Sequence, residues 1–325
     1  MGVYDARGGG NAHIDVVLTN ISVGLTNLGF AGDVLFPTVR VRKQSDIYYV
    51  FGDRSAWTRE ALDYRAPGAE ANEIPGLTVS TDTYFAQEHA LQIGIPDEEV
   101  ENVDSPLAPF RDGTELVTSR VLMGREFAIQ AMVRDVNNYP TAMKVTLAGT
   151  QQWNDYANSN PISDIKTGRR AMHAQIFREP NLALIPYQVM SQLEDHPDFI
   201  ERIKYSQAGV LTEQIIATMI GIQRIIVPGL GVNSANIGQA ASIGYLWGKD
   251  VVLAWVPGSA GLRLPAFGYE FNWPISGNVM VTDRWREESR VREVVRVRRR
   301  YDLKFIYVDG TGDTLAGYLI KDAVA

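Results

Sequence analysis

Histidine, cysteine, serine and carboxylate side chains carry out most protein catalysis and metal binding, so their spacing is considered first. Four histidines occur, and no two stand three or four positions apart, as they do in a helical metal-binding motif such as HExxH. Cysteine is absent, and neither a GxSxG nucleophile motif nor a GxxxxGKS/T phosphate loop occurs. The sequence therefore predicts a protein that is not an enzyme, with no catalytic residue, no metal site and no cofactor.

One glycine-rich segment imitates the start of a dinucleotide-binding loop. The sequence GLGVNS, at 229–234, follows a predicted strand at 222–227. The third glycine of the dinucleotide motif is missing, and 235–239 is not a convincing helix. Without a helix N-terminus, a pyrophosphate would lose its amide donors and the helix dipole. We interpret this segment as a loop at a contact between subunits.

Basic residues concentrate late in the sequence, where nine arginines and lysines fall between positions 284 and 304. Val291, Val295 and Val297 occupy one phase of the two-residue repeat of a strand, and most of the arginines occupy the other. This pattern predicts a long strand with one buried face and one basic face. The basic face could bind nucleic acid, could simply be solvated, or could pair with carboxylates of another subunit.

A second charged cluster lies at 97–104, where five acids occur in eight residues. Such a cluster stays solvated or awaits a basic partner. Because the net charge is −7 and acids are interspersed among the arginines, we favour arginine–carboxylate contacts between subunits over nucleic-acid binding. The candidate residues are Glu98, Glu99 and Glu101 in the acidic cluster and Arg292, Arg296 and Arg298 in the basic strand.

An extended hairpin precedes the acidic cluster. Two segments rich in aromatic and β-branched residues, at 46–53 and 84–95, predict its strands. The roughly thirty residues between them are rich in charge and contain two Pro-Gly turn signals. A two-stranded hairpin is marginal alone in water, so we expect its tip to rest on a neighbouring copy of the chain. The contact candidates in the tip are Trp57, Arg59, Tyr64 and Arg65.

Helical periodicity is strongest at 109–135. At 1.5 Å per residue this helix would be roughly 40 Å long, which suits a structural spine. A second helix is predicted at 161–177, and from 181 onward short alternating helices and strands predict an α/β subdomain. A closing strand is predicted at 317–324. The apolar stripe of the long helix consists of Val117, Val121, Gly124, Ala128 and Ala131.

The composition is that of a folded protein, with 45% hydrophobic and 21% charged residues among 325. No apolar run approaches the roughly 20 residues that a membrane-spanning helix needs. The first residues lack the basic flank and apolar core of a secretory signal. We therefore expect no membrane association.

The order of these parts resembles the major capsid proteins of tailed bacteriophages, whose fold is also used by encapsulin shells and the herpesvirus capsid floor. The resemblance covers nearly the whole chain. It rests on TYFAQEHALQIGIPDEEVENVDSP followed by ELVTSRVLMGREFAIQAMVRD, on TEQIIATMIGIQRIIV followed by GYLWGKDVVLAWVP, and on RVRRRYD followed by GYLIKDAV.

The resemblance implies an α+β fold, the phage major-capsid fold with long antiparallel strands. Its parts would be an N-terminal arm (1–45), an E-loop hairpin (46–95), a peripheral domain (96–180) with the spine helix (109–135), an axial α/β domain (181–285), a peripheral-domain strand (286–310) and a C-terminal return strand (311–325).

The same resemblance implies self-assembly, as hexamers and pentamers, into the icosahedral head shell of a tailed double-stranded-DNA phage. The expected location is the virion, after assembly in the host cytoplasm. The expected partners are further copies, a portal, a separate scaffolding protein and a cement protein, with DNA enclosed but not bound sequence-specifically. One branch crosslinks its shell through a hairpin lysine. Here no lysine occurs between Lys43 and Lys144, so we do not expect that bond.

Two alternatives stay open at the level of the sequence. An encapsulin-type compartment would share the fold but enclose enzymes, and would show a groove for a cargo peptide. A soluble α/β enzyme would behave as a small oligomer and would need a site that this sequence does not display.

Overall fold

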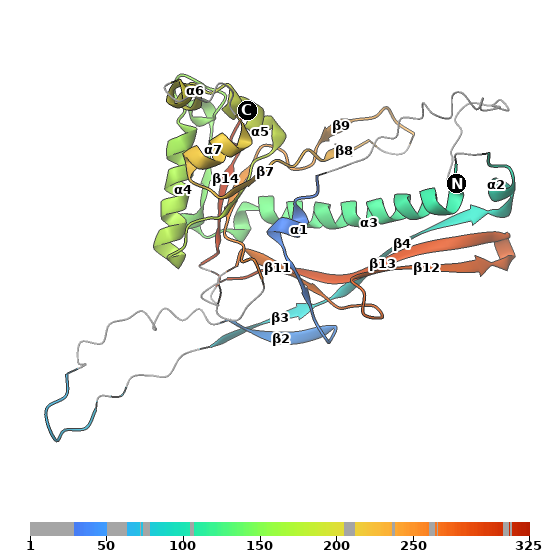
Figure 1. Ribbon diagram of the computed structural model, residues 1–325, viewed down its shortest axis with the longest axis horizontal. Helices are drawn as coiled ribbons and strands as arrows, with labels where there is room; N and C mark the ends of the chain where they lie inside the picture. Colours follow the sequence, from blue (N-terminus) through green and yellow to red (C-terminus); the bar gives the residue numbers. More distant parts are fainter. Residues whose placement is uncertain are drawn as a thin grey trace.

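A long helix packed along a long strand sets the shape of the molecule. The computed structural model describes residues 29–50, 64–71, 73, 79–104, 107–204, 212–235, 238–259, 264, 266–307, 312 and 314–325. In Figure 1 the helix α3 (Pro109–Arg134) lies along a sheet that contains β4 (Gln87–Pro96), β12 (Met280–Glu287) and β13 (Arg292–Phe305), and an α/β body stands at one end of this layer.

The long sheet is organised around β13. One edge of β13 pairs with β4, antiparallel, over ten residues. Its other edge pairs first with β12 and then with β11 (Gly268–Asn272), and β1 (Thr38–Arg40) adds in parallel to β11. Strands β11 and β12 lie in series, because the Trp273 N–H still bonds to the Arg300 carbonyl before pairing resumes at Met280 opposite Arg299.

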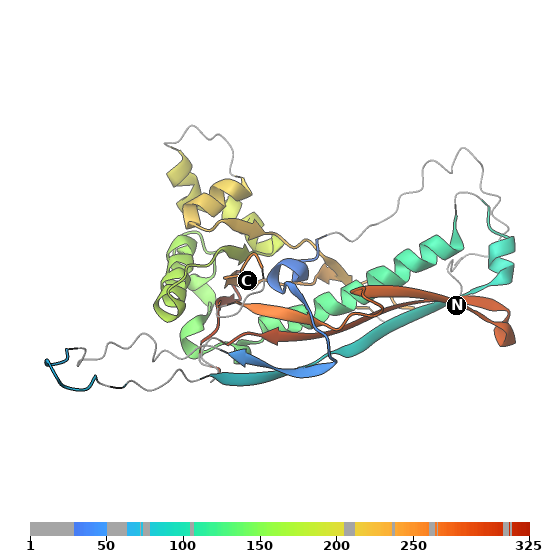
Figure 2. The same cartoon turned by 60° about the horizontal axis from the view of Figure 1, so that its bottom comes forward.

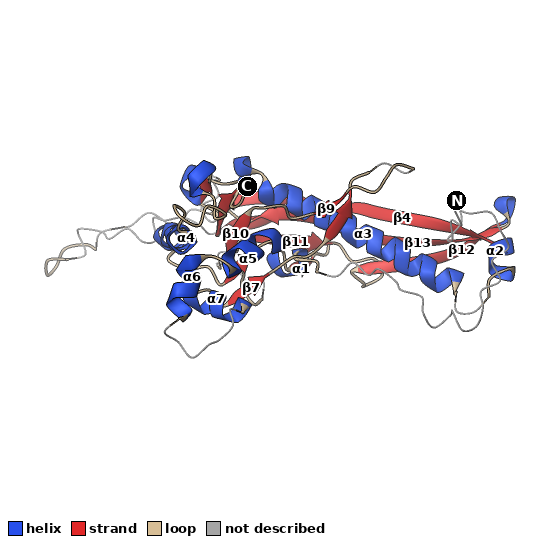
Figure 3. Ribbon diagram, turned by 90° about the horizontal axis from the view of Figure 1, so that it is seen from above, coloured by secondary structure: helices blue, strands red, loops and turns tan. Residues whose placement is uncertain are grey.

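Helix α3 covers one face of this sheet and crosses it obliquely (Figure 3). Its buried positions recur every four residues, and each such step advances about 40° beyond a full turn, so the buried stripe winds around the helix. The first half of the helix packs Val117 and Val121 against Val297 of the sheet. The second half packs Ile129 and Val133 against α1 (Gly32–Leu35) and the α/β body.

The α/β body has a five-stranded sheet in the order β5-β14-β10-β6-β7. All four residues of β10 are buried, as expected for a strand that helices cover on its faces. Asn160 caps the helix α4 by accepting a hydrogen bond from the Ser163 N–H. Gly221, with φ 68°, ends the helix α7. The elements are β5 (Lys144–Thr146), α4 (Pro161–Ile176), β6 (Leu182–Leu184), α5 (Tyr187–Glu194), α6 (Pro197–Ile203), α7 (Glu213–Ile220), β7 (Arg224–Ile226), β10 (Val251–Ala254) and β14 (Gly317–Lys321).

The root of the predicted hairpin is formed by β2 (Ser45–Val50) and β3 (Ser80–Phe85), which pair antiparallel. One face of this root packs on the chain's own sheet: the rings of Tyr84 and Tyr48 lie 4.8 Å and 5.1 Å from that of Phe271. Residues 64–71 lie far from both bodies, at the left end of Figures 1 and 2. The hairpin therefore has a root anchored within its own chain and a remote tip.

Three shorter elements complete the description. The acidic helix α2 (Asp97–Glu101) follows β4 at the end of the long sheet that is far from the α/β body. Strands β8 (Gly231–Asn233) and β9 (Ile243–Tyr245) form a small hairpin beside the α/β body. Strand β8 lies in the segment that imitated a dinucleotide loop, so this segment is partly a strand and not only a loop.

Several boundaries drawn from the sequence need correction. The partner of β2 is 80–85, whereas most of the segment predicted as the returning hairpin strand forms β4 and pairs with β13. Strands β11 and β12, placed by sequence in the axial part 181–285, belong to the long sheet. The closing strand β14 enters the α/β sheet between β5 and β10. The sequence thus predicted β4 and β14 as strands without their distant partners, and it did not predict β11 or β12 as strands.

The predicted apolar stripe of the long helix is correct in its first half and wrong in its second. Val117 and Val121 are buried, but Gly124, Ala128 and Ala131 are exposed. Because the buried stripe winds around the helix, its second half continues through Arg125, Ile129 and Val133 instead.

Candidate subunit-contact surfaces

The basic face of β13 is the face turned away from α3. Residues directly opposite each other share a face of a sheet, so Arg296 lies beside Asp283 of β12, and Arg300 lies beside Glu88 of β4. The Arg300 Nε donates to Glu88 Oε2 at 2.7 Å, and Arg296 Nη2 donates to Asp283 Oδ2 at 3.0 Å. Arg298 lies between the two acids, 2.6 Å from Asp283 Oδ2 and 3.5 Å from Glu88 Oε1.

These arginines hold the pKa values of their partners below the ordinary range. A hydrogen bond from Arg298 is the main cause for Asp283, and one from Arg300 is the main cause for Glu88. The predicted contact residues Arg296 and Arg298 therefore already have carboxylate partners within their own chain. Arg292 likewise donates through Nε to Glu287 Oε2 at 2.7 Å.

The outer face as a whole carries little net charge. On it, four arginines and Lys304 of β13 lie among four carboxylates, which are Glu88, Asp283, Glu287 and Asp302. A surface that binds nucleic acid nonspecifically needs more positive than negative charge where it meets the phosphates. The structure thus removes the main argument for a nucleic-acid surface on this strand.

The acidic helix α2 is tied to the same sheet by its first residue. Asp97 accepts two hydrogen bonds from Arg286, each 2.7 Å long, which lower its pKa. Glu98 and Glu101 extend into solvent, and Glu99 is half-buried. Of the predicted acidic candidates, α2 thus presents two exposed carboxylates at the end of the molecule.

The hairpin candidates divide between described and undescribed parts. Tyr64 is 81% exposed and Arg65 is also exposed, as a tip built to meet another surface would require. Trp57 and Arg59 lie outside the described residues. The root adds an apolar surface that the sequence analysis did not single out: Ile47, Tyr49 and Phe85 are exposed on the face opposite Tyr84.

A buried polar cluster joins the helix α3, the short helix α1 and the long sheet. Arg125 of α3 donates through Nε to Glu270 Oε2 of β11 at 2.5 Å and through Nη1 to Asp33 of α1 at 2.7 Å. Arg299 of β13 donates through Nη2 and Nε to Glu270 Oε1 at 2.6 Å and 3.0 Å. Since Glu270 is fully buried, its charge is balanced by two guanidinium groups from different elements.

The next residue of α3 holds the entry of the N-terminal segment. Glu126 is fully buried and accepts hydrogen bonds from the backbone N–H groups of Ala31 and Gly32, at 2.8 Å and 3.0 Å, and from Trp247 Nε1 at 3.0 Å. Burial raises its pKa despite these donors. Sequence reasoning missed this Arg125-Glu126 pair. The available signal was the four-residue spacing from Val117 and Val121, which continues to Arg125.

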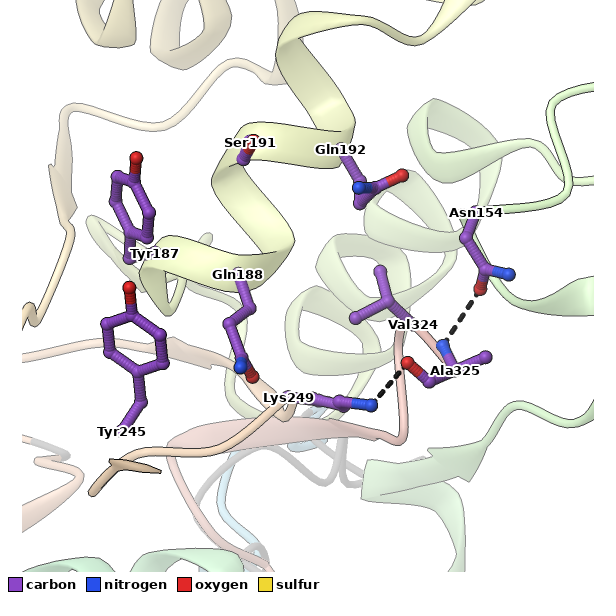
Figure 4. Close-up of a pocket in the computed structure, with 9 residues that line it drawn as sticks. All are labelled: Asn154, Tyr187, Gln188, Ser191, Gln192, Tyr245, Lys249, Val324 and Ala325. Carbon is purple, nitrogen blue, oxygen red and sulfur yellow. Dashed lines mark hydrogen bonds between the residues drawn. The ribbon is translucent and has the colours of Figure 1, made fainter. Parts of the chain in front are cut away.

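A cavity of about 360 Å³ opens on the α/β body between α5, β9 and the last residues of the chain (Figure 4). The rings of Tyr187 and Tyr245 lie 5.8 Å apart on one side. On the other, Lys249 Nζ donates to the Ala325 carbonyl, and the Ala325 N–H donates to Asn154 Oδ1 at 2.8 Å. The residues that line it include no histidine, aspartate or glutamate.

Metal and membrane sites are also missing from the part of the chain that the structure describes. Within those ranges no group of three or more histidine, cysteine or acidic residues is arranged to hold a metal ion. Among the described helices, none has the length and apolar character that crossing a bilayer requires.

Comparisons with known proteins agree on one kind of relative. No family model matches the chain. It is 29% identical over 313 residues to the major capsid protein of Burkholderia phage BcepMu, covering 95% of this chain and 96% of that protein. It is 27% identical over 272 residues to the major capsid protein of Pseudomonas phage JBD67, covering 82% and 85%.

The fold gives the same picture. A phage-related protein from Bordetella bronchiseptica RB50 superposes with a TM-score of 0.68 at 24% identity, covering 95% of this chain and 97% of that one. The capsid structure of cyanophage P-SCSP1u superposes with a TM-score of 0.61 at 10% identity, covering 98% and 96%. At these identities, the likeness establishes the fold.

Proposed function

We propose that this chain, a phage major capsid protein by sequence similarity and fold, tiles an icosahedral head shell as hexamers and pentamers around double-stranded DNA. The α/β bodies gather around the symmetry axes, and the long sheets with their α3 helices make the wall between them. The role is structural and not catalytic. The chain thus belongs in the virion, after assembly in the host cytoplasm with a portal, a separate scaffolding protein and a cement protein.

The observation that carries this proposal is the projecting hairpin on a chain that matches phage major capsid proteins over nearly its whole length. Its root is fixed to Phe271 by stacked aromatic rings, so the body sets the direction in which the root leaves the sheet. Its described tip residues are exposed and contact neither body. A tip held at a distance in this way gains its packing from a neighbouring copy, and many such contacts make a shell cooperative.

The charge distribution supports a wall that encloses DNA without gripping it. The chain has a net charge of −7, and the arginines of β13 are matched by carboxylates of neighbouring strands. Such a surface gives weak, strongly salt-dependent binding to DNA at most. We therefore expect DNA to be held in the shell by enclosure and not by a specific binding site.

The hairpin's role is tested by deleting 54–80. We expect a folded chain, with the unfolding midpoint of the full protein, that fails to form closed particles by electron microscopy and analytical ultracentrifugation. A matched variant, in which 54–79 is replaced by a Gly/Ser segment of equal length, separates loss of contacts from loss of length. Normal particles from both variants would contradict the assigned role.

A further inference from the structure

Strand β4 has one edge that no described strand pairs with. Its only partner in the described ranges is β13. Six consecutive residues, 87–92, are exposed although they belong to a five-stranded sheet. Proteins usually protect such an edge with lysine, proline or charge. Here 87–92 contains neither lysine nor proline, and its single carboxylate, Glu88, is bonded to Arg300.

The α3 helix leaves an apolar surface next to this edge. Val121 still packs on Val297, but the following positions of that helical face, Gly124 and Ala128, are exposed. A methyl group added at Gly124 would meet no described atom within 4 Å. Phe127 is 42% exposed beside them.

Leu91 completes this surface from the side of the sheet. It stands directly opposite Val297, and therefore on the face that α3 covers, yet it is 46% exposed. The edge of β4 and the exposed side of α3 thus form a corner. Backbone groups line one wall of the corner, and apolar side chains line the other. A strand that is apolar at alternate positions satisfies both walls at once.

The chain itself contains such a segment ahead of its first described residue. Ile14, Val16 and Leu18 fall in one phase of a two-residue repeat, with Asp15 and Val17 in the other, which is typical of a strand with one wholly apolar face and one mixed face. The described chain begins on the opposite side of α3, where Glu126 accepts a hydrogen bond from the Ala31 N–H. Glu126 stands two positions from Gly124 and from Ala128, so it projects about 200° away from them around the helix.

The number of residues between a candidate strand and residue 29 favours 14–18 over a second candidate at 21–25. Residues 19–28 span at most about 33 Å, which is ample to pass around a helix about 10–12 Å across. A second alternating run, at 21–25, is followed by only three residues before 29, an extended reach of about 10 Å, which is too short.

We propose that residues 14–18 add as a strand to the free edge of β4 in the same chain, placing Ile14, Val16 and Leu18 against Leu91 and the Gly124–Ala131 side of α3. The segment would give the edge its missing hydrogen bonds and cover the exposed apolar surface of the helix. This inference does not depend on shell formation, because it concerns the unassembled chain.

The absence of cysteine allows a direct test with single thiols. Ala128→Cys is alkylated with a maleimide in the unassembled full chain, in a chain lacking residues 2–18, and in the full chain carrying Val16→Asp. We expect the thiol to react about tenfold or more slowly in the first than in the other two. Glu115→Cys, also exposed on α3 but on another side, is the control and should react equally in all three.

Two outcomes would overturn the proposal. Equal reactivity of the Ala128→Cys thiol in all three backgrounds would show that residues 14–18 do not cover this corner. Protection that appears only as the protein concentration rises would assign the corner to a segment of a second copy. Hydrogen exchange of the β4 amides, compared between the full and shortened chains, reads the same contact without any substitution.

Discussion

Arg125 Nε and Glu270 Oε2 lie 2.5 Å apart in an ion pair that is almost wholly removed from solvent. The pair joins the middle of α3 to β11, and Arg299 of β13 completes it from the other side of the carboxylate. One buried acid thereby fixes the spine helix against the long sheet. The geometry of a charge cluster, and not only apolar packing, sets the relation between these elements.

Replacing Glu270 by glutamine should be strongly destabilising, because two buried guanidinium groups would then face a neutral amide. Removing one partner of a buried pair typically costs about 3–5 kcal/mol. Urea unfolding followed by circular dichroism measures the effect. Glu115→Gln, which alters an exposed pair with Arg111 on the same helix, is the control and should cost about 1 kcal/mol or less. Similar costs for the two variants would show that the buried cluster is not a structural joint.

Tyr84→Ala should free the hairpin root from the sheet. Tyr84 is buried and stacks on Phe271, and removal of a buried aromatic ring costs about 3 kcal/mol or more. We expect faster tryptic cleavage at Arg42 and Lys43, which precede β2, together with poorer particle assembly. Tyr49→Ala, on the outer face of the same hairpin, should leave the cleavage rate unchanged. If Tyr84→Ala leaves cleavage unaltered, the root is not held by this stack.

Gly317→Ala should lower stability by overpacking. A Cβ at Gly317 would lie 2.3 Å from an atom of the Phe267 ring, which sits in the core between the two bodies. Forcing extra volume into such a core costs about 1–3 kcal/mol. Gly244→Ala, in strand β9, would meet no atom within 4 Å and should be nearly neutral. Thermal unfolding of the two variants checks the difference, and equal melting temperatures would show that the core yields around Gly317.

Arg298→Glu distinguishes a contact within the chain from one between subunits. The new carboxylate would stand beside Asp283 and Glu88 of its own chain, so the unassembled protein should unfold at a lower urea concentration. If Arg298 served only a neighbouring subunit, unfolding would be unchanged and only assembly, measured by sedimentation, would fail. Arg290→Glu, at the exposed turn between β12 and β13, is the matched control.

Acid should destabilise the long sheet through the same residues. The folded-state pKa values of Asp283 and Glu88 lie below their ordinary values of 3.8 and 4.5, mainly because of hydrogen bonds from Arg298 and Arg300. Groups with depressed pKa values stabilise the fold above the unfolded values, and this contribution is lost as pH falls below about 4.5 and through the folded values. Urea unfolding between pH 7 and pH 3 should show this loss. Asp283→Asn should reduce the loss of unfolding free energy between pH 7 and pH 3. An unchanged loss would refute the assignment.

Local periodicity was enough to locate most elements. The spine helix begins at Pro109 as predicted and ends one residue earlier than predicted, and the alternation of valine and arginine marked the long strand β13. These signals are local, because each depends on residues within one helix or strand. The fold class and the phage capsid relationship followed from the order of such elements and are confirmed by the comparisons.

What the sequence could not supply was the choice of distant partners. Nothing near Arg298 indicates that its carboxylates come from β4 and β12, and nothing near Gly317 indicates that its strand enters the sheet beside β10. The error in the second half of the α3 stripe has the same origin, since a helical pattern does not reveal that the buried positions turn from the long sheet toward α1 and the α/β body. The assignment of Glu98, Glu101 and Tyr64 to contacts between subunits stays a prediction.

The position of β14 bears on how the protein is made. Residues 317–321 pair with β5 and β10, which the ribosome releases much earlier, so the central sheet of the α/β body stays open until translation has passed Lys321. A chain that lacks this strand leaves the backbone edges of β5 and β10 unpaired. The central sheet of the α/β body is therefore complete only when residues from the middle and the far end of the sequence have come together.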